Sequence, residues 1–114
     1  MIFVIGGLGG GKRGYVKTLG YSDDEMADAV IDDKPVVYNL QNLVTARQGA
    51  YMDLLPVLLE KKVVICNEVG SGIVPVDRAE RFAREATGRL CVELASQAEK
   101  VVRICCGIPA VIKG

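Results

Sequence analysis

The fold is decided by residues 2–14, which read Ile-Phe-Val-Ile-Gly-Gly-Leu-Gly-Gly-Gly-Lys-Arg-Gly. The first four residues are apolar and three of them are β-branched, which predicts a short buried strand. Six glycines then fall within nine positions. A strand that runs into a glycine-rich turn and then into a helix is typical of α/β proteins with a parallel sheet.

The glycines follow the spacing of a phosphate loop. From Gly6 the chain has four residues, Gly11 and then Lys12, which matches that pattern up to its last position. In such a loop backbone N–H groups point into one concavity and hold phosphate oxygens, and glycine reaches the required dihedral angles cheaply. Lys12 adds a positive charge, and the following helix favours anions at its N-terminus. The candidate nucleotide-binding residues are Gly6, Gly7, Leu8, Gly9, Gly10, Gly11, Lys12 and Arg13.

Arg13 departs from the pattern. A phosphate loop has Ser or Thr there, and its hydroxyl binds Mg²⁺. A guanidinium has donors and no acceptor, so Arg13 cannot ligate a metal ion. We therefore assign no metal ligand and expect nucleotide binding in which Mg²⁺ is weak or absent. The alternative left open is a glycine-rich turn that binds nothing.

Length and composition limit the class of protein to which this chain can belong. The chain has 114 residues, which predicts a single phosphate-loop α/β domain over residues 1–114. Half of the residues are hydrophobic, and 14 basic side chains balance 14 acidic ones. This balance gives no reason to expect nucleic acid or a membrane as partner. No basic region precedes the apolar start, so we expect no signal peptide and a cytoplasmic protein.

The four cysteines do not predict a metal site. Cys66, Cys91, Cys105 and Cys106 contain no pair separated by two residues, and the sequence has no histidine. We interpret them as reduced, mostly buried thiols of a cytosolic protein.

The rest of the chain alternates between helical and strand patterns. We predict helices over residues 13–19, 23–31, 50–61 and 77–98, and strands over 36–38, 63–66, 101–105 and 110–112. Residues 40–50 show no clear pattern. The regular part of the third helix should begin near Leu55, because Pro56 fits only a first turn. Ala79 and Phe82 should open the buried face of the last helix. This order predicts a phosphate-loop NTPase-like fold with a mainly parallel sheet flanked by helices.

Glu68 follows the third predicted strand. The carboxyl ends of parallel strands face the ligand in open sheets, and phosphate-loop proteins hold an acid there. Glu68 is therefore either a catalytic acid or an ordinary residue at the end of a strand.

The second half of the chain carries a resemblance. Residues 67–75 read Asn-Glu-Val-Gly-Ser-Gly-Ile-Val-Pro, and Arg78, Phe82 and Gly88-Arg89-Leu90 follow. With Gly6-Gly7 and Gly11-Lys12 at the start, this sequence resembles the bifunctional adenosylcobinamide kinase/adenosylcobinamide-phosphate guanylyltransferase family of cobalamin biosynthesis, as a shortened and divergent member.

The resemblance implies a homotrimer that binds GTP or ATP and a cobinamide. It implies a kinase that phosphorylates the hydroxyl of adenosylcobinamide, and a transferase that passes GMP from GTP through a histidine-linked intermediate. Lys12 and Glu68 match the family and are its candidate catalytic residues. Arg13 replaces the metal-binding hydroxyl, and Asn39 stands where the family's middle strand carries an acid. Without a histidine, the guanylyltransfer should be lost.

Three functions therefore remain open: a nucleotide-binding kinase, a pseudoenzyme with a binding or regulatory role, and a structural homologue. We favour nucleotide binding with impaired kinase chemistry. The alternative is a non-catalytic structural or regulatory homologue that does not bind nucleotide.

Overall fold

The computed structural model describes residues 1–7, 9–47, 50–68 and 77–114. Within these residues the strands are β1 (Ile2–Gly6), β2 (Met26–Asp28), β3 (Val36–Tyr38), β4 (Val63–Asn67), β5 (Lys100–Cys105) and β6 (Ile108–Lys113). The α-helices are α1 (Lys12–Thr18), α2 (Leu40–Ala46), α3 (Leu55–Leu59) and α4 (Arg78–Gln97). Two 3₁₀ turns, Asp23–Glu25 and Met52–Leu54, precede β2 and α3.

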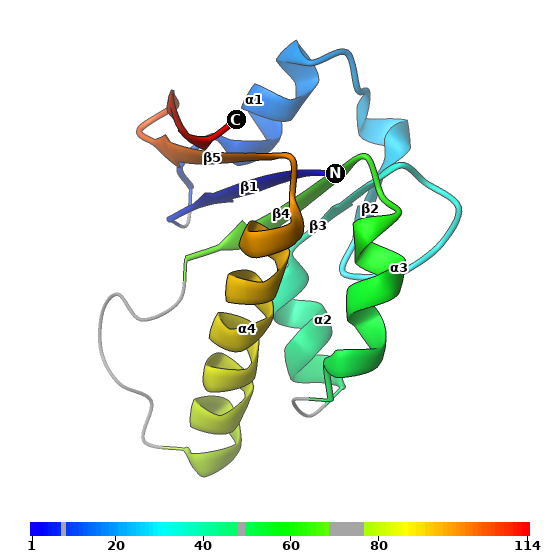
Figure 1. The fold of residues 1–114 in the computed structure, drawn as a ribbon, viewed down its shortest axis with the longest axis vertical. Coiled ribbons are helices and arrows are strands. Elements are labelled where there is room, and N and C mark those ends of the chain that lie inside the picture. The colour runs from blue at the N-terminus through cyan, green and yellow to red at the C-terminus, as the bar shows by residue number, and fades with distance from the viewer. Residues whose placement is uncertain (8, 48–49, 69–76) are drawn as a thin grey trace.

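The strands form one sheet in the order β2-β3-β4-β1-β5-β6 (Figure 1). The first five strands are parallel, and β6 runs antiparallel to β5. β1 lies between β4 and β5, so the glycine loop that follows it emerges near the middle of the sheet. The predicted α/β fold, a mainly parallel sheet flanked by helices, is confirmed.

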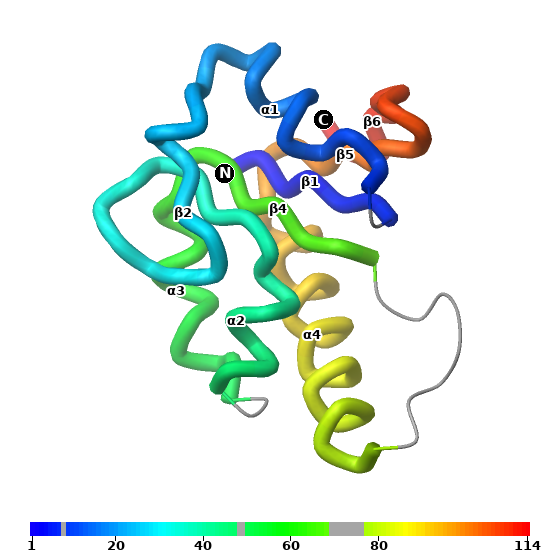
Figure 2. Tube along the Cα trace, turned by 180° about the vertical axis from the view of Figure 1, so that it is seen from behind, coloured from blue at the N-terminus to red at the C-terminus, as the bar shows by residue number. Residues whose placement is uncertain are grey.

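Helices cover the two faces of the sheet unequally. α2, α3 and α4 pack on one face, where Phe3, Val64 and Leu90 belong to the larger buried cluster. α1 packs on the other face, where Val16 belongs to the smaller buried cluster together with Val4 and Ile65. Figure 2 shows the same arrangement from behind. The helices after the neighbouring strands β1 and β4 therefore lie on opposite faces, which is where open α/β sheets form a ligand crevice.

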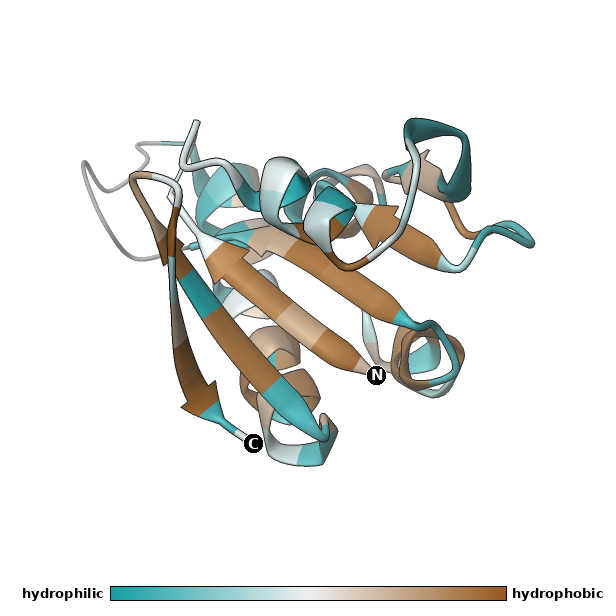
Figure 3. Ribbon diagram, turned by 90° about the horizontal axis from the view of Figure 1, so that it is seen from above, coloured by the Kyte–Doolittle hydropathy of each residue, from teal (hydrophilic) through white to brown (hydrophobic). Residues whose placement is uncertain are grey.

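The strands are apolar because both sheet faces are covered at the centre of the molecule. Four of the five residues of β4 are buried, and Figure 3 shows the hydrophobic colouring along the strands. β6 is exposed along its whole length. It follows a tight turn in which Cys106 and Gly107 both have positive φ, a geometry suited to the hairpin twist. Pro109 is tolerated because β6 is an edge strand.

The helix predicted over residues 23–31 is wrong. The Ser22 and Glu25 capping box forms, but it closes only the 3₁₀ turn. The next residues enter β2, where Met26 and Ala27 are buried and pair with β3. Sheet pairing and burial therefore override the local helical signal.

Two helices differ from expectation in other ways. α2 lies in residues 40–50, where no element was predicted, and it buries Leu40 and Val44, one turn apart. α4 begins with exposed turns: Phe82 is 57% exposed, and Ala79 is also exposed. The buried face begins only at Ala83, because the first turns of α4 extend away from the sheet (Figure 1).

The helix predicted over residues 50–61 is shorter in the structure, where the 3₁₀ turn Met52–Leu54 is followed by α3. The regular helix after the second 3₁₀ turn begins at Leu55, with Pro56 in its first turn, as predicted. β6 is longer than the predicted strand over 110–112. In the part of the chain that the structure describes, none of the helices has the length and apolar character needed to cross a lipid bilayer.

Candidate functional site

The glycine loop after β1 is a tight turn. The N–H of Gly10 donates to the carbonyl of Gly7 at 3.1 Å. Gly9 and Gly11 have φ of 71° and 88°, a left-handed conformation that residues with a side chain rarely adopt. Two of the glycines are therefore required by the shape of the loop.

Gly6 is required for a different reason, the close approach of β5. A Cβ on Gly6 would lie 2.5 Å from the backbone oxygen of Ile104. The loop also rests on the turn between β5 and β6, because the N–H of Gly107 donates to the carbonyl of Gly10 at 2.8 Å. The end of β5 and its turn thus hold the loop in position from one side.

Lys12 is the first residue of α1, and its side chain turns back into the loop. Its Nζ donates to the carbonyl of Gly7 at 2.7 Å, and the residue is 9% exposed. Burial lowers the pKa of the Lys12 ammonium, while the nearby Cys66 and Glu68 oppose that shift. An anion at the loop would therefore meet a buried cation that is already directed at the backbone.

Arg13 points along the outside of α1 toward β3. Its Cζ lies 4.8 Å from the centre of the Tyr38 ring, which is cation–π geometry. The stacking positions the guanidinium next to the loop, and among the described residues no acidic group pairs with it. Its N–H groups can therefore still donate to an oxyanion.

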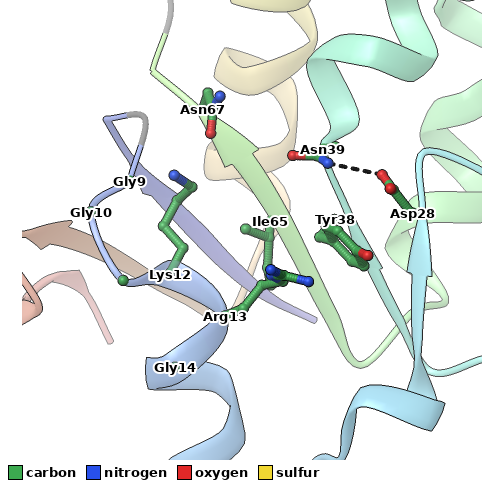
Figure 4. A pocket seen from close by; sticks show the side chains of 11 residues that line it. Gly9, Gly10, Lys12, Arg13, Gly14, Asp28, Tyr38, Asn39, Ile65 and Asn67 are labelled. Carbon is green, nitrogen blue, oxygen red and sulfur yellow. Dashed lines mark hydrogen bonds between the residues drawn. The ribbon is translucent and has the colours of Figure 1, made fainter.

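A pocket of about 420 Å³ opens between the loop and the ends of the strands (Figure 4). In Figure 4 the side chains of Lys12 and Arg13 both extend into the space between the loop and the strand ends. Its lining residues are Gly9, Gly10, Gly11, Lys12, Arg13, Gly14, Asp28, Tyr38, Asn39, Ile65 and Asn67. The wall formed by the loop and the start of α1 thus presents backbone groups and two cations. The opposite wall, at the strand ends, presents polar side chains.

The polar wall is formed by the ends of β2 and β3. The Nδ2 of Asn39 donates to the Oδ1 of Asp28 at 2.8 Å, the dashed line in Figure 4. Each of these strand ends has a residue with positive φ, Ala29 at 54° and Asn39 at 56°. The amide and the carboxylate face the pocket across from Arg13, so this wall can accept hydrogen bonds from a ligand's hydroxyl or amino groups.

The structure brings most of the predicted binding residues to one place. Gly9, Gly10, Gly11, Lys12 and Arg13 line the pocket. Gly6 and Gly7 support the loop through β5 and the Lys12 ammonium instead. Leu8 lies outside the described residues, as do residues 69–76 of the stretch that carried the resemblance.

Glu68 stands beside the pocket rather than in its lining. Its carboxylate is paired with Arg103 through two contacts, Nε to Oε1 at 2.5 Å and Nη2 to Oε2 at 3.2 Å. That pair raises the pKa of Arg103. The carboxylate of Glu68 is thus paired with a side chain of β5, on the far side of β1, although it is still close enough to act on the pKa of Lys12.

Sequence reasoning missed Asp28 and Tyr38 as site residues. Each is the last residue of a parallel strand, as Asn67 is of β4. The rule that ligands bind at the carboxyl ends of parallel strands could have found both. Asp28 was hidden because its segment was predicted to be helical.

Comparisons with known proteins agree with this architecture. Residues 33–112 match the family described as cobinamide kinase / cobinamide phosphate guanyltransferase. The bifunctional adenosylcobalamin biosynthesis protein CobU of Salmonella typhimurium (strain LT2) is 34% identical over 94 residues, 82% of this chain and 48% of that protein. The protein of the same name from Escherichia coli (strain K12) is 43% identical over 53 residues, 46% of this chain and 29% of that protein. The chain therefore spans about half the length of the curated relatives, or less.

Proposed function

The chain belongs to the cobinamide kinase / cobinamide phosphate guanyltransferase family, and on that premise we propose that it binds GTP or ATP at residues 6–13. In this proposal residues 1–114 act as one phosphate-loop domain. Kinase chemistry is impaired, and guanylyl transfer through a histidine is lost from this chain.

One observation carries the proposal: two cations, Lys12 and Arg13, meet at a pocket lined by glycine backbone. Phosphate oxygens take backbone N–H groups and cations as partners, so this combination suits a polyphosphate better than a neutral ligand. A bound phosphate would replace the carbonyl of Gly7 as the acceptor of the Lys12 ammonium. The buried ammonium then gains an anionic partner that solvent screens poorly.

Arg13 gives the proposed site its Mg²⁺ independence. It has no oxygen with which to hold the ion, and its fixed positive charge would repel a cation bound nearby. In binding, a guanidinium can substitute for part of the metal's charge by donating to phosphate oxygens. It carries one positive charge where a magnesium ion would supply two, so without that ion the charge that develops on the phosphates during transfer would be less well stabilised and the phosphoryl-transfer rate should be low.

Glu68 is the proposed second catalytic residue, and its pairing limits it. The carboxylate must leave Arg103 before it can act at the terminal phosphate, because both of its oxygens contact that guanidinium. This pairing is a second reason to expect impaired kinase activity. Family membership makes a cobinamide the proposed further ligand. In this proposal its hydroxyl binds at the polar wall formed by Asp28 and Asn39.

The test is a calorimetric titration with GTP and with ATP, each in the presence and absence of Mg²⁺. Wild-type protein should bind at least one of them in EDTA. Lys12→Ala should abolish binding because the buried ammonium is lost. If neither nucleotide binds under any of these conditions, the alternative of a structural homologue that binds no nucleotide is correct.

A further inference from the structure

Two cysteines face each other across the interface between the sheet and its longest helix. Cys66 lies on β4 and Cys91 lies on α4, and their Sγ atoms are 3.7 Å apart. Both side chains are buried, with exposed fractions of 0% for Cys66 and 8% for Cys91. The two thiols are therefore in direct contact, and Cys91 is the one that solvent can reach.

Most neighbours of this pair are apolar, and Lys12 is the charged side chain near Cys66. Both cysteines belong to the larger core cluster, together with Phe3, Val64 and Leu90. A disulfide has an S–S length of about 2.05 Å, so the sulfurs would have to approach each other by only about 1.7 Å. The chain already places the two thiols near bonding distance, so oxidation does not need a rearrangement of the fold.

We propose that Cys66 and Cys91 are a dithiol modification site, which hydrogen peroxide oxidises to an intramolecular disulfide within the folded protein. The Cys91 sulfur attacks peroxide, the O–O bond breaks, and a sulfenic acid forms with release of one water. The Cys66 sulfur then attacks the Cys91 sulfur, and the oxygen leaves as a second water. Two thiols and one peroxide thus yield one disulfide and two waters.

The order of attack follows from the environment of the two thiols. The hydrogen bond with Cys66 lowers the pKa of Cys91. The hydrogen bond with Cys91, together with burial, raises the pKa of Cys66 well above its ordinary value. Cys91 is also the more exposed of the two, which favours it as the first nucleophile.

The disulfide would fasten the end of β4 to α4. Asn67, the next residue after Cys66, lines the pocket, and its N–H donates to the side-chain oxygen of Gln41 at 3.0 Å. A bond between residues 66 and 91 would also restrict the segment between them in the unfolded chain. We expect oxidation to raise the thermal midpoint of unfolding, and a thiol reductant to reverse that rise.

The experiment must separate this pair from the two exposed cysteines, Cys105 and Cys106. The double variant Cys105→Ser/Cys106→Ser is treated with hydrogen peroxide, alkylated in denaturant and digested with trypsin without reduction. Before alkylation, we expect the intact mass of the treated protein to be about 2 Da below that of the untreated protein, because two thiol hydrogens are lost. Cleavage at Lys62, Arg78, Arg89 and Lys100 should release peptide 63–78 joined to peptide 90–100.

Controls make the result decisive. Adding Cys91→Ala to the double variant should remove the mass loss, the linked peptides and the rise in thermal midpoint. The same variants oxidised in urea show whether the reagents can form the disulfide in an unfolded chain. If the folded double variant keeps both thiols while the urea-treated one is cross-linked, the proposal is wrong. A sulfinic acid on Cys91 in place of the disulfide would also overturn it.

Discussion

Gly6→Ala should destabilise the protein through a single backbone clash. The new Cβ would lie 2.5 Å from the Ile104 oxygen, in a stretch where Gly6 and Ile104 are paired in register. The oxygen belongs to the backbone of β5, so it cannot rotate away as a side chain would. β1 and β5 must instead separate locally, and overpacking of this kind costs about 1–3 kcal/mol. The midpoint of thermal unfolding should fall by roughly 4–12 °C.

Gly7→Ala is the matched control for Gly6→Ala. A Cβ on Gly7 meets nothing within 4 Å, so its stability should stay within about 0.5 kcal/mol of wild type. Thermal unfolding followed by far-ultraviolet circular dichroism and urea unfolding at 25 °C measure both variants. If the two variants have equal stability, the close approach of β5 to the start of the loop is refuted as the reason for Gly6.

Three further predictions concern the site and the assembly. The affinity for GTP should be full at neutral pH and fall as the pH rises through the pKa of Lys12, because phosphate binds the charged form. Burial lowers that pKa, so the loss should begin below the ordinary value of 10.5, and an affinity that stays constant up to that pH contradicts the assignment. Incubation with labelled GTP should leave no acid-labile GMP on the protein, because the sequence has no histidine; stoichiometric label would reveal another nucleophile. By family membership the protein should self-associate as a trimer, and sedimentation equilibrium at micromolar concentration that shows only monomer would exclude this.

The loop and the central strands could be predicted because local sequence alone determines them. The apolar run at residues 2–5, the glycines and Lys12 sit in adjacent positions, so strand, turn and helix could be identified together. β2 could not be predicted, because its three residues are held by pairing with β3 rather than by their own propensity. The capping box of Ser22 and Glu25 does form, but the helix that it caps is a single 3₁₀ turn.

The wall of the pocket opposite the glycine loop could be predicted only with knowledge of the strand order in the sheet. Asp28 and Asn39 are eleven residues apart and meet only because β2 and β3 are parallel neighbours. The stacking of Arg13 on Tyr38 joins α1 to β3 in the same way. The pairing of Glu68 with Arg103 depends on β4 and β5, which are separated by β1. Each of these contacts affects which groups the site can offer to a ligand. None of them can be predicted from the spacing of residues along the chain.

Binding without Mg²⁺ depends on Arg13, which stands in place of the metal ligand. The direct measurement is the affinity for GTP with and without Mg²⁺, in wild-type protein and in Arg13→Ser, by calorimetry. We predict that Mg²⁺ changes the wild-type dissociation constant by less than about twofold, whereas Arg13→Ser gains affinity with Mg²⁺ by more than about tenfold. If wild-type protein instead binds GTP only with Mg²⁺, and Arg13→Ser behaves in the same way, then the ion is held elsewhere and Arg13 does not replace it.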